Sequence, residues 1–475
     1  MKYHFIKYTA IFIFMLLLVP TTIIAQDTAV VDTVVTITEE AATVALPVDA
    51  PVEEVAETLD SGNTAWIIVA TVLVMMMTIP GLAFFYGGLV RQKNVLSILM
   101  QCLVITGVIS ILWFAFGYSW VFGTSFMDGS LGQFIGGFDK VFLKGITLDT
   151  LNPLGGNIPE ILFALFQCMF AVITPALIIG AFAERIKFSG FLIFTILWAI
   201  LVYNPMAHWV WGGGWIGEMG AIDFAGGTVV HINAGISALI MALMLGRRKG
   251  YRTTGHPITP HNIPFVFLGT SLLWLGWFGF NAGSGLAADG LAANAFLVTH
   301  LATAVAAVVW MLLDWIINKK PTAIGFCTGA VAGLVAITPA AGTVDVLGAF
   351  CIGGISSLVC YAMVAYIKPK LKYDDSLDAF GVHGIGGIVG SILTGVFATQ
   401  AITGIDGAQG ALYGDWHQLW IQIVATAASV AYSAIATVIL FFIVNKTIGL
   451  RVTKEEESIG LDISQHGEFA YSEDE

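Results

Sequence analysis

Long apolar runs alternate with short polar segments along most of this chain. A helix rises about 1.5 Å per residue, so each run is long enough to cross a hydrocarbon core of about 30 Å. We place the predicted spans approximately at residues 64–89, 95–122, 158–183, 188–210, 226–246, 263–283, 291–317, 322–341, 344–366, 380–400 and 418–445. The pattern predicts an all-α polytopic membrane protein with eleven transmembrane helices.

The two ends of the chain have other patterns. Residues 1–25 combine two lysines with a short apolar run and are typical of a cleavable signal peptide, the alternative being a first transmembrane helix. Residues 26–62 are acidic and contain no aromatic residue, and we expect them to form a disordered extracytoplasmic leader. Residues 63–446 form the predicted transmembrane domain, and residues 447–475 form a cytoplasmic tail.

Basic residues are distributed unevenly between the predicted loops. Sixteen of the twenty Lys and Arg residues follow odd-numbered spans, two lie in the signal, and the others are Lys140 and Lys144. Basic residues are enriched in cytoplasmic loops, so this distribution predicts an N-terminus outside and a C-terminus inside. Eleven spans also fit two inverted five-helix repeats plus one extra helix, an arrangement that places a transport site near the midplane.

Composition agrees with a membrane location. The mean hydropathy is +0.85 and 11% of the residues are charged, against about 25% in soluble proteins. The net charge of −12 arises at the two ends, because the acidic leader through Asp60 carries −9 and the chain from Lys446 onward carries −5. This leaves +2 for everything else and gives no indication of nucleic-acid binding. The five cysteines lie within apolar runs at spacings that match no metal template, so we interpret them as packing residues.

Two histidines inside predicted spans are the main candidates for chemistry. His231 lies in the fifth span with Gly227 and Gly235 four residues to either side, and His383 lies in the tenth span before three glycines at helical spacing. An ionisable side chain in a membrane is costly, and glycines let a second helix approach closely. The two rings therefore predict one shared site, in which neutral imidazoles could relay a proton along an apolar path. For His231 alone, a hydrogen-bonded packing role is the alternative.

Other polar and aromatic residues have two interpretations each. Asp223 precedes the fifth span, where its carboxylate could cap the helix or stabilise a nearby cation. Trp211 follows the fourth span and is either an interfacial tryptophan or a cation–π face. We assign His208 and His300 to packing, because neither has a glycine setting like that of the paired histidines.

Two side-chain pairs at a spacing of four residues share a helix face. They are Phe166 with Phe170 in the third span and Phe280 with Ser284 in the sixth. Such stripes belong more often to a core than to a gate, so spacing alone does not make them site residues.

Taken together, the motifs of residues 63–470 resemble those of the ammonium transporter family, which includes methylammonium permeases and Rhesus proteins. The matching segments are Asp223–Gly235, Gly180–Arg185, Gly276–Ser284, Phe380–Gly384 and Gly460–Glu468. The resemblance implies a homotrimer in the bacterial inner membrane, with one pore and eleven helices per subunit. It further implies transport of ammonium or ammonia, with no enzyme activity, cofactor or metal.

The resemblance also assigns roles by position. It implies an outer ammonium-recruitment site at Trp211, Phe170, Ser284 and Asp223, a gate at Phe170 and Phe280, and a pore lined by His231, His383 and Phe166. It does not decide between net transfer of charge and conduction of ammonia alone. The leader is longer than we expect for bacterial members.

The tail carries a further expectation from the same resemblance. Residues 459–462 interrupt an acidic run with apolar residues and a glycine, so we expect them to dock, whereas residues 468–475 are expected to be solvated. The resemblance implies that the tail packs under the trimer and helps to bind a PII-type signal protein, which blocks the pore from the cytoplasmic side.

Two other functions fit the same sequence features. One is an ammonium sensor that signals through a partner protein, although the tail contains no output domain. The other is a membrane protein that uses His231 and His383 as haem or metal ligands.

Overall fold

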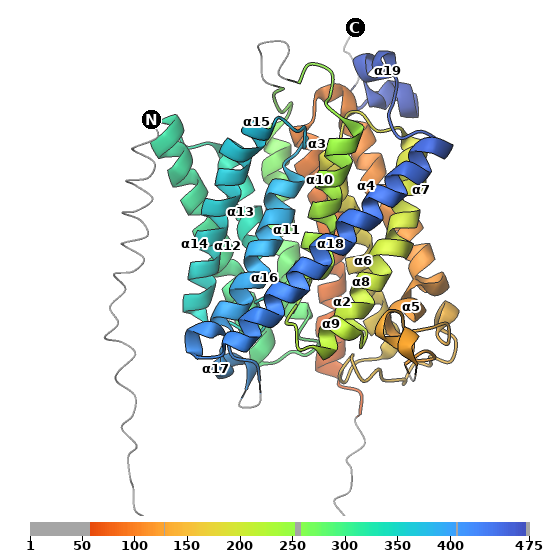
Figure 1. Ribbon diagram of the computed structural model, residues 1–475, viewed down its shortest axis with the longest axis vertical. Coiled ribbons are helices and arrows are strands. Elements are labelled where there is room, and N and C mark those ends of the chain that lie inside the picture. Colours follow the sequence, from red (N-terminus) through yellow and green to blue (C-terminus); the bar gives the residue numbers. More distant parts are fainter. Residues whose placement is uncertain (1–57, 128, 252–257, 405–406, 472–475) are drawn as a thin grey trace, which may run out of the picture. The chain divides into compact units, whose positions relative to one another are not determined.

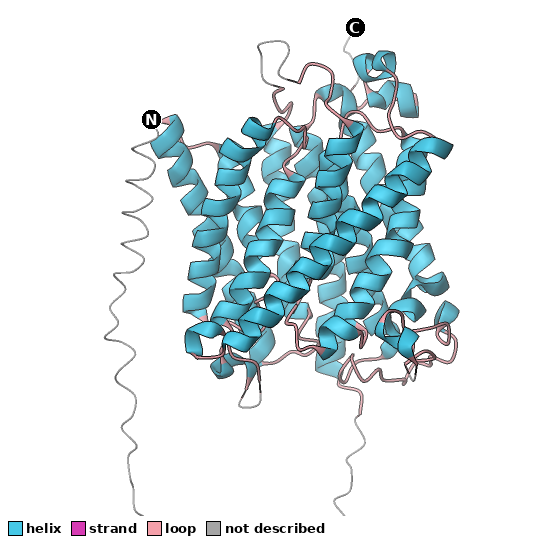
Figure 2. Ribbon diagram, in the orientation of Figure 1, coloured by secondary structure: helices cyan, strands magenta, loops and turns pink. Residues whose placement is uncertain are grey.

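The computed structural model describes residues 58–127, 129–251, 258–404 and 407–471 (Figure 1). The predicted signal peptide, most of the predicted leader and the last four residues of the tail lie outside the described residues. Figure 2 shows helices and connecting loops throughout the described part of the chain. The described residues also form two isolated β-bridges, Leu151 with Pro159 and Ile186 with Arg451. The predicted all-α membrane fold is confirmed.

The helical elements follow one another with few long connections. Through the first half they are α2 (Ser61–Met76), η2 (Met77–Leu82), α3 (Ala83–Leu89), α4 (Val95–Leu112), η4 (Trp113–Gly117), α5 (Tyr118–Phe122), α6 (Glu160–Phe182), α7 (Phe188–Trp198), η7 (Ala199–Tyr203), α8 (Asn204–Trp211), α9 (Trp215–Glu218), η8 (Gly227–Ile232) and α10 (Asn233–Leu245). In the second half they are α11 (Ile263–Gly283), α12 (Gly290–Asn318), α13 (Ala323–Ile337), α14 (Val346–Ala362), η9 (Met363–Ile367), α15 (Lys368–Leu371), η10 (Phe380–Gly384), α16 (Ile385–Phe397), α17 (Gln400–Thr403), α18 (Trp416–Thr447), α19 (Lys454–Ile459) and η12 (Asp462–His466). Short 3₁₀ turns lie at Gln92–Asn94, Ser130–Gln133, Val141–Leu143 and Ala411–Tyr413.

Ten of the helices in the described residues are long and apolar enough to cross a membrane. The remaining predicted span, residues 322–341, corresponds to α13, which has 15 helical residues and is shorter than the other ten. Most residues of α13 are buried, as are most of those between α13 and α14. This explains why hydropathy alone extended the predicted span to residue 341, beyond the end of α13.

Several helices begin at an acidic cap. The side chains of Asp60, Asp289, Asp345 and Asp415 accept hydrogen bonds from first-turn amides of α2, α12, α14 and α18. The first amides of a helix have no intrahelical partner, and a carboxylate there also favours the positive end of the helix dipole. These residues fix where four of the apolar helices start.

Glycines allow the central helices to touch through their backbones. A Cβ at Gly235 of α10 would overlap the backbone of Gly384, and one at Gly390 of α16 would overlap Ala336 of α13. Small residues at helix crossings are the main means of close packing in membranes. The glycine spacing noted in the sequence therefore brings η8 and η10, with their histidines, into the centre of the bundle.

The bundle has two ends that differ in composition. Figure 1 shows α15 and α19 at one end with the C-terminus, and α5, α9 and α17 at the other, while α18 crosses the bundle diagonally. We call the first end the C-terminal face and the second the distal face.

Candidate functional site

The imidazole rings of His231 and His383 lie against each other in the middle of the bundle. Their Nδ1 atoms are 3.3 Å apart, and the two ring planes are nearly parallel at 16°. Both side chains are buried. Since a neutral imidazole has one donor and one acceptor nitrogen, the two rings can share one proton between their Nδ1 atoms.

Both rings are carried by π-helical segments, η8 and η10. A π-helical turn is wider than an α-helical one and occurs often at functional sites. A Cβ added at Gly387 of α16, the helix that continues from η10, would lie 3.0 Å from the Gly227 carbonyl oxygen of η8. The helix that follows His383 thus approaches η8 at a position where the sequence has a glycine.

Aromatic rings cover the histidine pair. Trp277 of α11 stacks on His231 with ring centroids 5.3 Å apart, and its indole nitrogen donates to Thr338 at 2.8 Å. Phe280, one turn further along α11, lies 6.1 Å from the same imidazole. Trp277 lies within the Gly276–Ser284 motif but was not predicted to be a site residue. Its spacing of three residues from Phe280, on an otherwise apolar helix, was the available signal.

Phe170 of α6 and Phe280 of α11 close the path above the histidines. Their ring centroids are 4.4 Å apart, and both rings are buried. Phe166 contacts Phe170 edge to face at 5.1 Å, and Trp211 contacts it from the other side at 5.8 Å. The four rings come from three helices, so only the fold brings them together.

A cavity of about 260 Å³ opens on the distal side of these phenylalanines. Trp211, Phe170 and Ser284 line it, which brings together three of the residues selected from the sequence. The Ser284 hydroxyl donates to the Phe280 carbonyl at 2.8 Å, which leaves its oxygen lone pairs free to accept. An aromatic face and a hydroxyl acceptor suit a small cation that donates hydrogen bonds.

Asp223 lies beside this cavity but directs its carboxylate elsewhere. The two oxygens accept from the amides of Gly226, Gly227, Thr228 and Val229 and from the Thr228 hydroxyl. Burial raises the pKa of the Asp223 carboxyl, and these donors act in the opposite direction. The carboxylate therefore caps η8, while the Asp223 backbone carbonyl accepts from the Trp211 indole at 2.8 Å.

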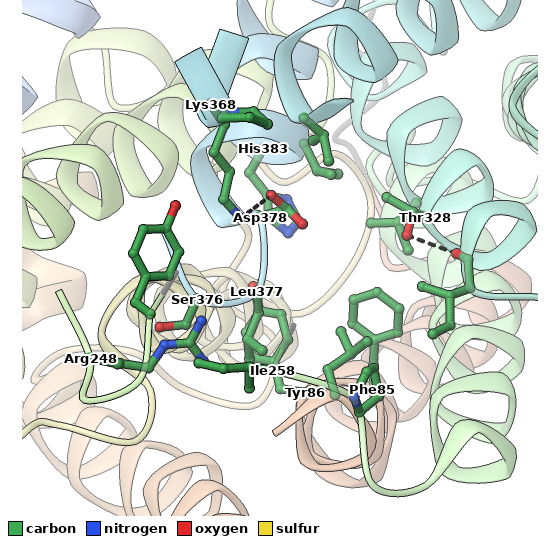
Figure 3. A pocket seen from close by; sticks show the side chains of 18 residues that line it. Phe85, Tyr86, Arg248, Ile258, Thr328, Lys368, Ser376, Leu377, Asp378 and His383 are labelled. Atoms are coloured by element: carbon green, nitrogen blue, oxygen red, sulfur yellow. Dashed lines mark hydrogen bonds and ion pairs between the residues drawn. The ribbon is translucent and has the colours of Figure 1, made fainter. Parts of the chain in front are cut away.

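A larger cavity of about 640 Å³ opens at the C-terminal face (Figure 3). Its wall carries Arg248, Asp378 and His383, and Lys368 forms an ion pair with Asp378 at 2.6 Å. Between the two cavities, a constriction with a cavity of about 10 Å³ is lined by both histidines and Phe280. His383 lines both the constriction and the C-terminal cavity, so the two adjoin at this ring.

Comparisons with known proteins agree on one family. The profile of the Ammonium Transporter Family matches residues 65–471. The chain belongs to the ammonium transporter family. It is 49% identical to an ammonium transporter of Bacillus subtilis over 87% of this chain and 100% of that protein. It is 50% identical to an ammonium transporter of Aquifex aeolicus over 87% and 94%.

Solved structures of related proteins have the same fold. The crystal structure of Saccharomyces cerevisiae Mep2 superposes with a TM-score of 0.79 at 36% identity, covering 88% of this chain and 92% of that one. A protein described as a sensor Amt protein superposes with a TM-score of 0.78 at 32% identity, covering 85% and 98%. This member of the ammonium transporter family is thus a multi-pass membrane protein with a known architecture.

In this ammonium transporter family member, an ion-pair network borders the C-terminal cavity at Arg248. Buried Glu184 pairs with Arg248 at 3.1 Å and with Arg91 at 2.8 Å, and Arg248 also pairs with Asp374 at 3.0 Å. Burial alone would raise the pKa of Glu184, but Arg248 and Arg91 outweigh it and hold the pKa below its usual value. The network joins the loops that follow α3, α6 and α10 to the loop that precedes η10.

The two histidines assigned to packing have different surroundings. His300 of α12 is exposed on this subunit, with Trp274 at 5.5 Å and Phe278 at 6.2 Å between ring centroids. His208 of α8 is fully buried and contacts two backbone carbonyls. Within the described ranges, no group of three or more His, Cys, Asp or Glu side chains has the arrangement of a metal site.

Proposed function

We propose that this protein transports ammonium across a bacterial inner membrane through the path between its two cavities. The observation that carries the proposal is the buried His231–His383 pair, at 3.3 Å between Nδ1 atoms, in a constriction between the distal cavity and the cavity at the C-terminal face. Membership of the ammonium transporter family supports the substrate. The protein acts as a transporter and not as an enzyme.

The proposed path divides the work between three sites. Trp211, Phe170 and Ser284 bind ammonium in the distal cavity, and the buried Asp223 completes this recruitment site by holding the start of η8 with its carboxylate and the Trp211 indole with its backbone carbonyl. Phe170 and Phe280 form a gate that must rotate apart, because their closely packed, tilted rings fill the route. Phe166 forms the wall behind Phe170.

Below the gate, a charged species has a high free energy. An ion at the bilayer centre costs from about 3 to more than 10 kcal/mol, which ammonium avoids if it releases its proton above the constriction. Neutral ammonia then passes the apolar wall. The histidine pair either returns the proton by a separate relay, giving net charge transfer, or passes ammonia alone.

A transport assay separates these outcomes. The purified protein is reconstituted in vesicles, and ammonium-dependent current and uptake are measured at the same substrate concentrations. Current and uptake together support charge transfer, and uptake without current supports ammonia conduction. The absence of both current and uptake would contradict the proposed function.

Sensing is the second candidate, because the sensor Amt protein aligns with 85% of this chain. A sensor would bind ammonium and change its association with a partner while reconstituted vesicles show no uptake. The same vesicle assay, combined with ammonium binding measured by calorimetry, distinguishes the two functions.

The topology and domain boundaries form part of the proposal. We place the distal face outside the cytoplasm, with two inverted five-helix repeats plus α18, a signal peptide over residues 1–25 and an acidic leader over 26–62. The equivalent positions of η8 and η10, each bearing a histidine, support the repeats. Single cysteines at Asp60 and Lys454 test the orientation on intact cells. An impermeant reagent should label the first, and labelling of the second would contradict the topology.

Assembly and regulation complete the proposal. We propose a homotrimer in the lipid bilayer whose C-terminal tail, residues 447–475, helps to bind a PII-type protein at the cytoplasmic face. Support comes from the docked conformation of residues 450–466 against the loops of that face. Deleting residues 455–475 should weaken capture of a cognate PII protein and lower transport while leaving a trimer by native mass spectrometry. Equal capture by both chains would contradict this role.

A further inference from the structure

Both ring nitrogens of His208 face a backbone carbonyl oxygen. Nδ1 lies 2.6 Å from the Val121 oxygen and Nε2 lies 2.7 Å from the Gly132 oxygen. The side chain is fully buried on α8, three residues before Trp211. Val121 belongs to the last turn of α5, and Gly132 to the 3₁₀ turn Ser130–Gln133 in the connection between α5 and α6, residues 123–159, which we call the distal segment.

A neutral imidazole cannot satisfy both contacts. It has one N–H and one lone pair, whereas a carbonyl oxygen only accepts. One of the two short contacts would then place a nitrogen lone pair against an oxygen lone pair, at a side chain that is fully buried. A doubly protonated ring donates at both nitrogens and removes the conflict.

The partners of His208 also favour a positive charge. The last carbonyls of a helix lack intrahelical donors and form the negative end of its dipole, and Val121 closes a 31-residue span. Gly212 makes room for the contact, because a Cβ there would overlap the Val121 oxygen and lie 2.6 Å from Nδ1 of His208. The chain therefore places His208 between two carbonyl acceptors, those of Val121 and Gly132, and Gly212 leaves the space that the Val121 contact needs.

The charged groups around His208 have other partners. On the distal segment, Asp139 accepts from the amides of Thr124 and Ser125, and Lys140 pairs with Glu160 of α6. On α9, Glu218 accepts from Gln133 at 2.8 Å. Within the described residues, the hydrogen-bonding contacts of the His208 ring are the two carbonyls, so backbone dipoles balance its charge.

We propose that His208 is an imidazolium that joins α5 and the distal segment to α8, and is a positioning residue for Trp211. The amides of Gly212 and Gly214 both donate to the His208 carbonyl at 3.0 Å, so the residue also sets the chain that continues from Trp211. Its effect on transport rests on the proposed function, whereas its protonation state does not.

The protonation state can be measured directly in the full-length protein. Histidine is labelled with ¹⁵N, and the carbonyl carbons of valine and glycine with ¹³C, so that the His208 nitrogens are recognised by their proximity to both labels. We expect both ring nitrogens to carry a proton at neutral pH in lipid-reconstituted samples. A signal from an unprotonated nitrogen at this site would overturn the proposal, whether or not the vesicles transport ammonium.

Two variants test the positioning role. His208→Gln leaves one end of the side chain without a donor, and Gly212→Ala disturbs the Val121 contact from the other side. In both, we expect the half-saturating ammonium concentration to rise several-fold, with a smaller change in maximal rate. His417→Gln replaces an exposed histidine and serves as the control.

The opposite results are equally informative. Correctly folded variants with an unchanged half-saturating concentration would overturn the positioning role, as would a loss confined to the maximal rate. If His208→Gln fails to fold, Gly212→Ala and the labelling experiment on the unaltered protein still decide the question.

Discussion

Replacing Asp462 by Ala should release the C-terminal tail from the bundle. Asp462 is buried, and its carboxylate accepts from the amides of Leu96 at 3.1 Å and Ser97 at 2.8 Å. These are first-turn amides of α4, whose own preceding residue, Asn94, provides no side-chain cap. Asn94 instead accepts from the Leu461 amide at 2.9 Å. A tail residue therefore caps a membrane helix that lies more than 360 positions earlier in the chain.

The size of the effect follows from the lost cap. Replacing a capping carboxylate by Ala costs about 0.5–2 kcal/mol, and the charge at the helix N-terminus adds roughly 0.3–1 kcal/mol at an exposed site. A net loss of about 1–2 kcal/mol raises the undocked population about 5–30-fold. The other tail contacts remain, including those of Glu457 with Lys249 and Arg451, so the variant should keep its fold.

Hydrogen exchange measures this population. The amides of Leu96, Ser97 and Leu461 should exchange about 5–30-fold faster in Asp462→Ala, because each is protected only while the tail is docked. Glu455→Ala is the matched control, since it removes one negative charge from an exposed position of the same tail. Equal exchange in both variants would refute the reasoning.

The docked tail also reaches the helix that carries a pore histidine. Arg451 donates to the carbonyls of Leu245 and Arg247 at 2.6 Å, at the C-terminal end of α10. We therefore expect Asp462→Ala to lower transport in the same direction as the deletion of residues 455–475, but less. Faster tail exchange with unchanged transport would separate docking from activity.

Three further outcomes are expected. His231→Ala or His383→Ala should abolish selective ammonium transport without loss of folding or assembly, and normal uptake by either would contradict a shared role of the pair. Trp211→Leu should raise the half-saturating ammonium concentration more than it lowers protein yield, which a concentration series in vesicles measures. Glu184→Gln should cost about 3–5 kcal/mol at neutral pH, because Arg248 loses a buried partner. Since the pKa of Glu184 is lowered in the folded protein, its stabilisation is present above about pH 4.3 and lost below it. The difference in thermal stability between the two proteins should therefore shrink as pH falls below that value, and a constant difference would contradict the assignment.

Much of the architecture was determined by the sequence alone. Backbone amides in a bilayer must be satisfied internally, so each apolar run had to become a helix, and hydropathy placed the helices. Glycine spacing marked where helices cross, as Gly235 and Gly390 illustrate. The costs of burying an imidazole pointed to His231 and His383 before any contact was known.

Only the tertiary structure decided how side chains use their hydrogen-bonding groups. The sequence left Asp223 between a cap and a cation site, and the fold commits its carboxylate to the amides of η8. Sequence reasoning gave His208 a packing role, whereas the fold places two carbonyls from separate segments at its nitrogens. Trp277 became a neighbour of His231 only through the packing of α11. Hydropathy and spacing describe one helix at a time, but donors and acceptors are matched across helices that lie far apart in the chain.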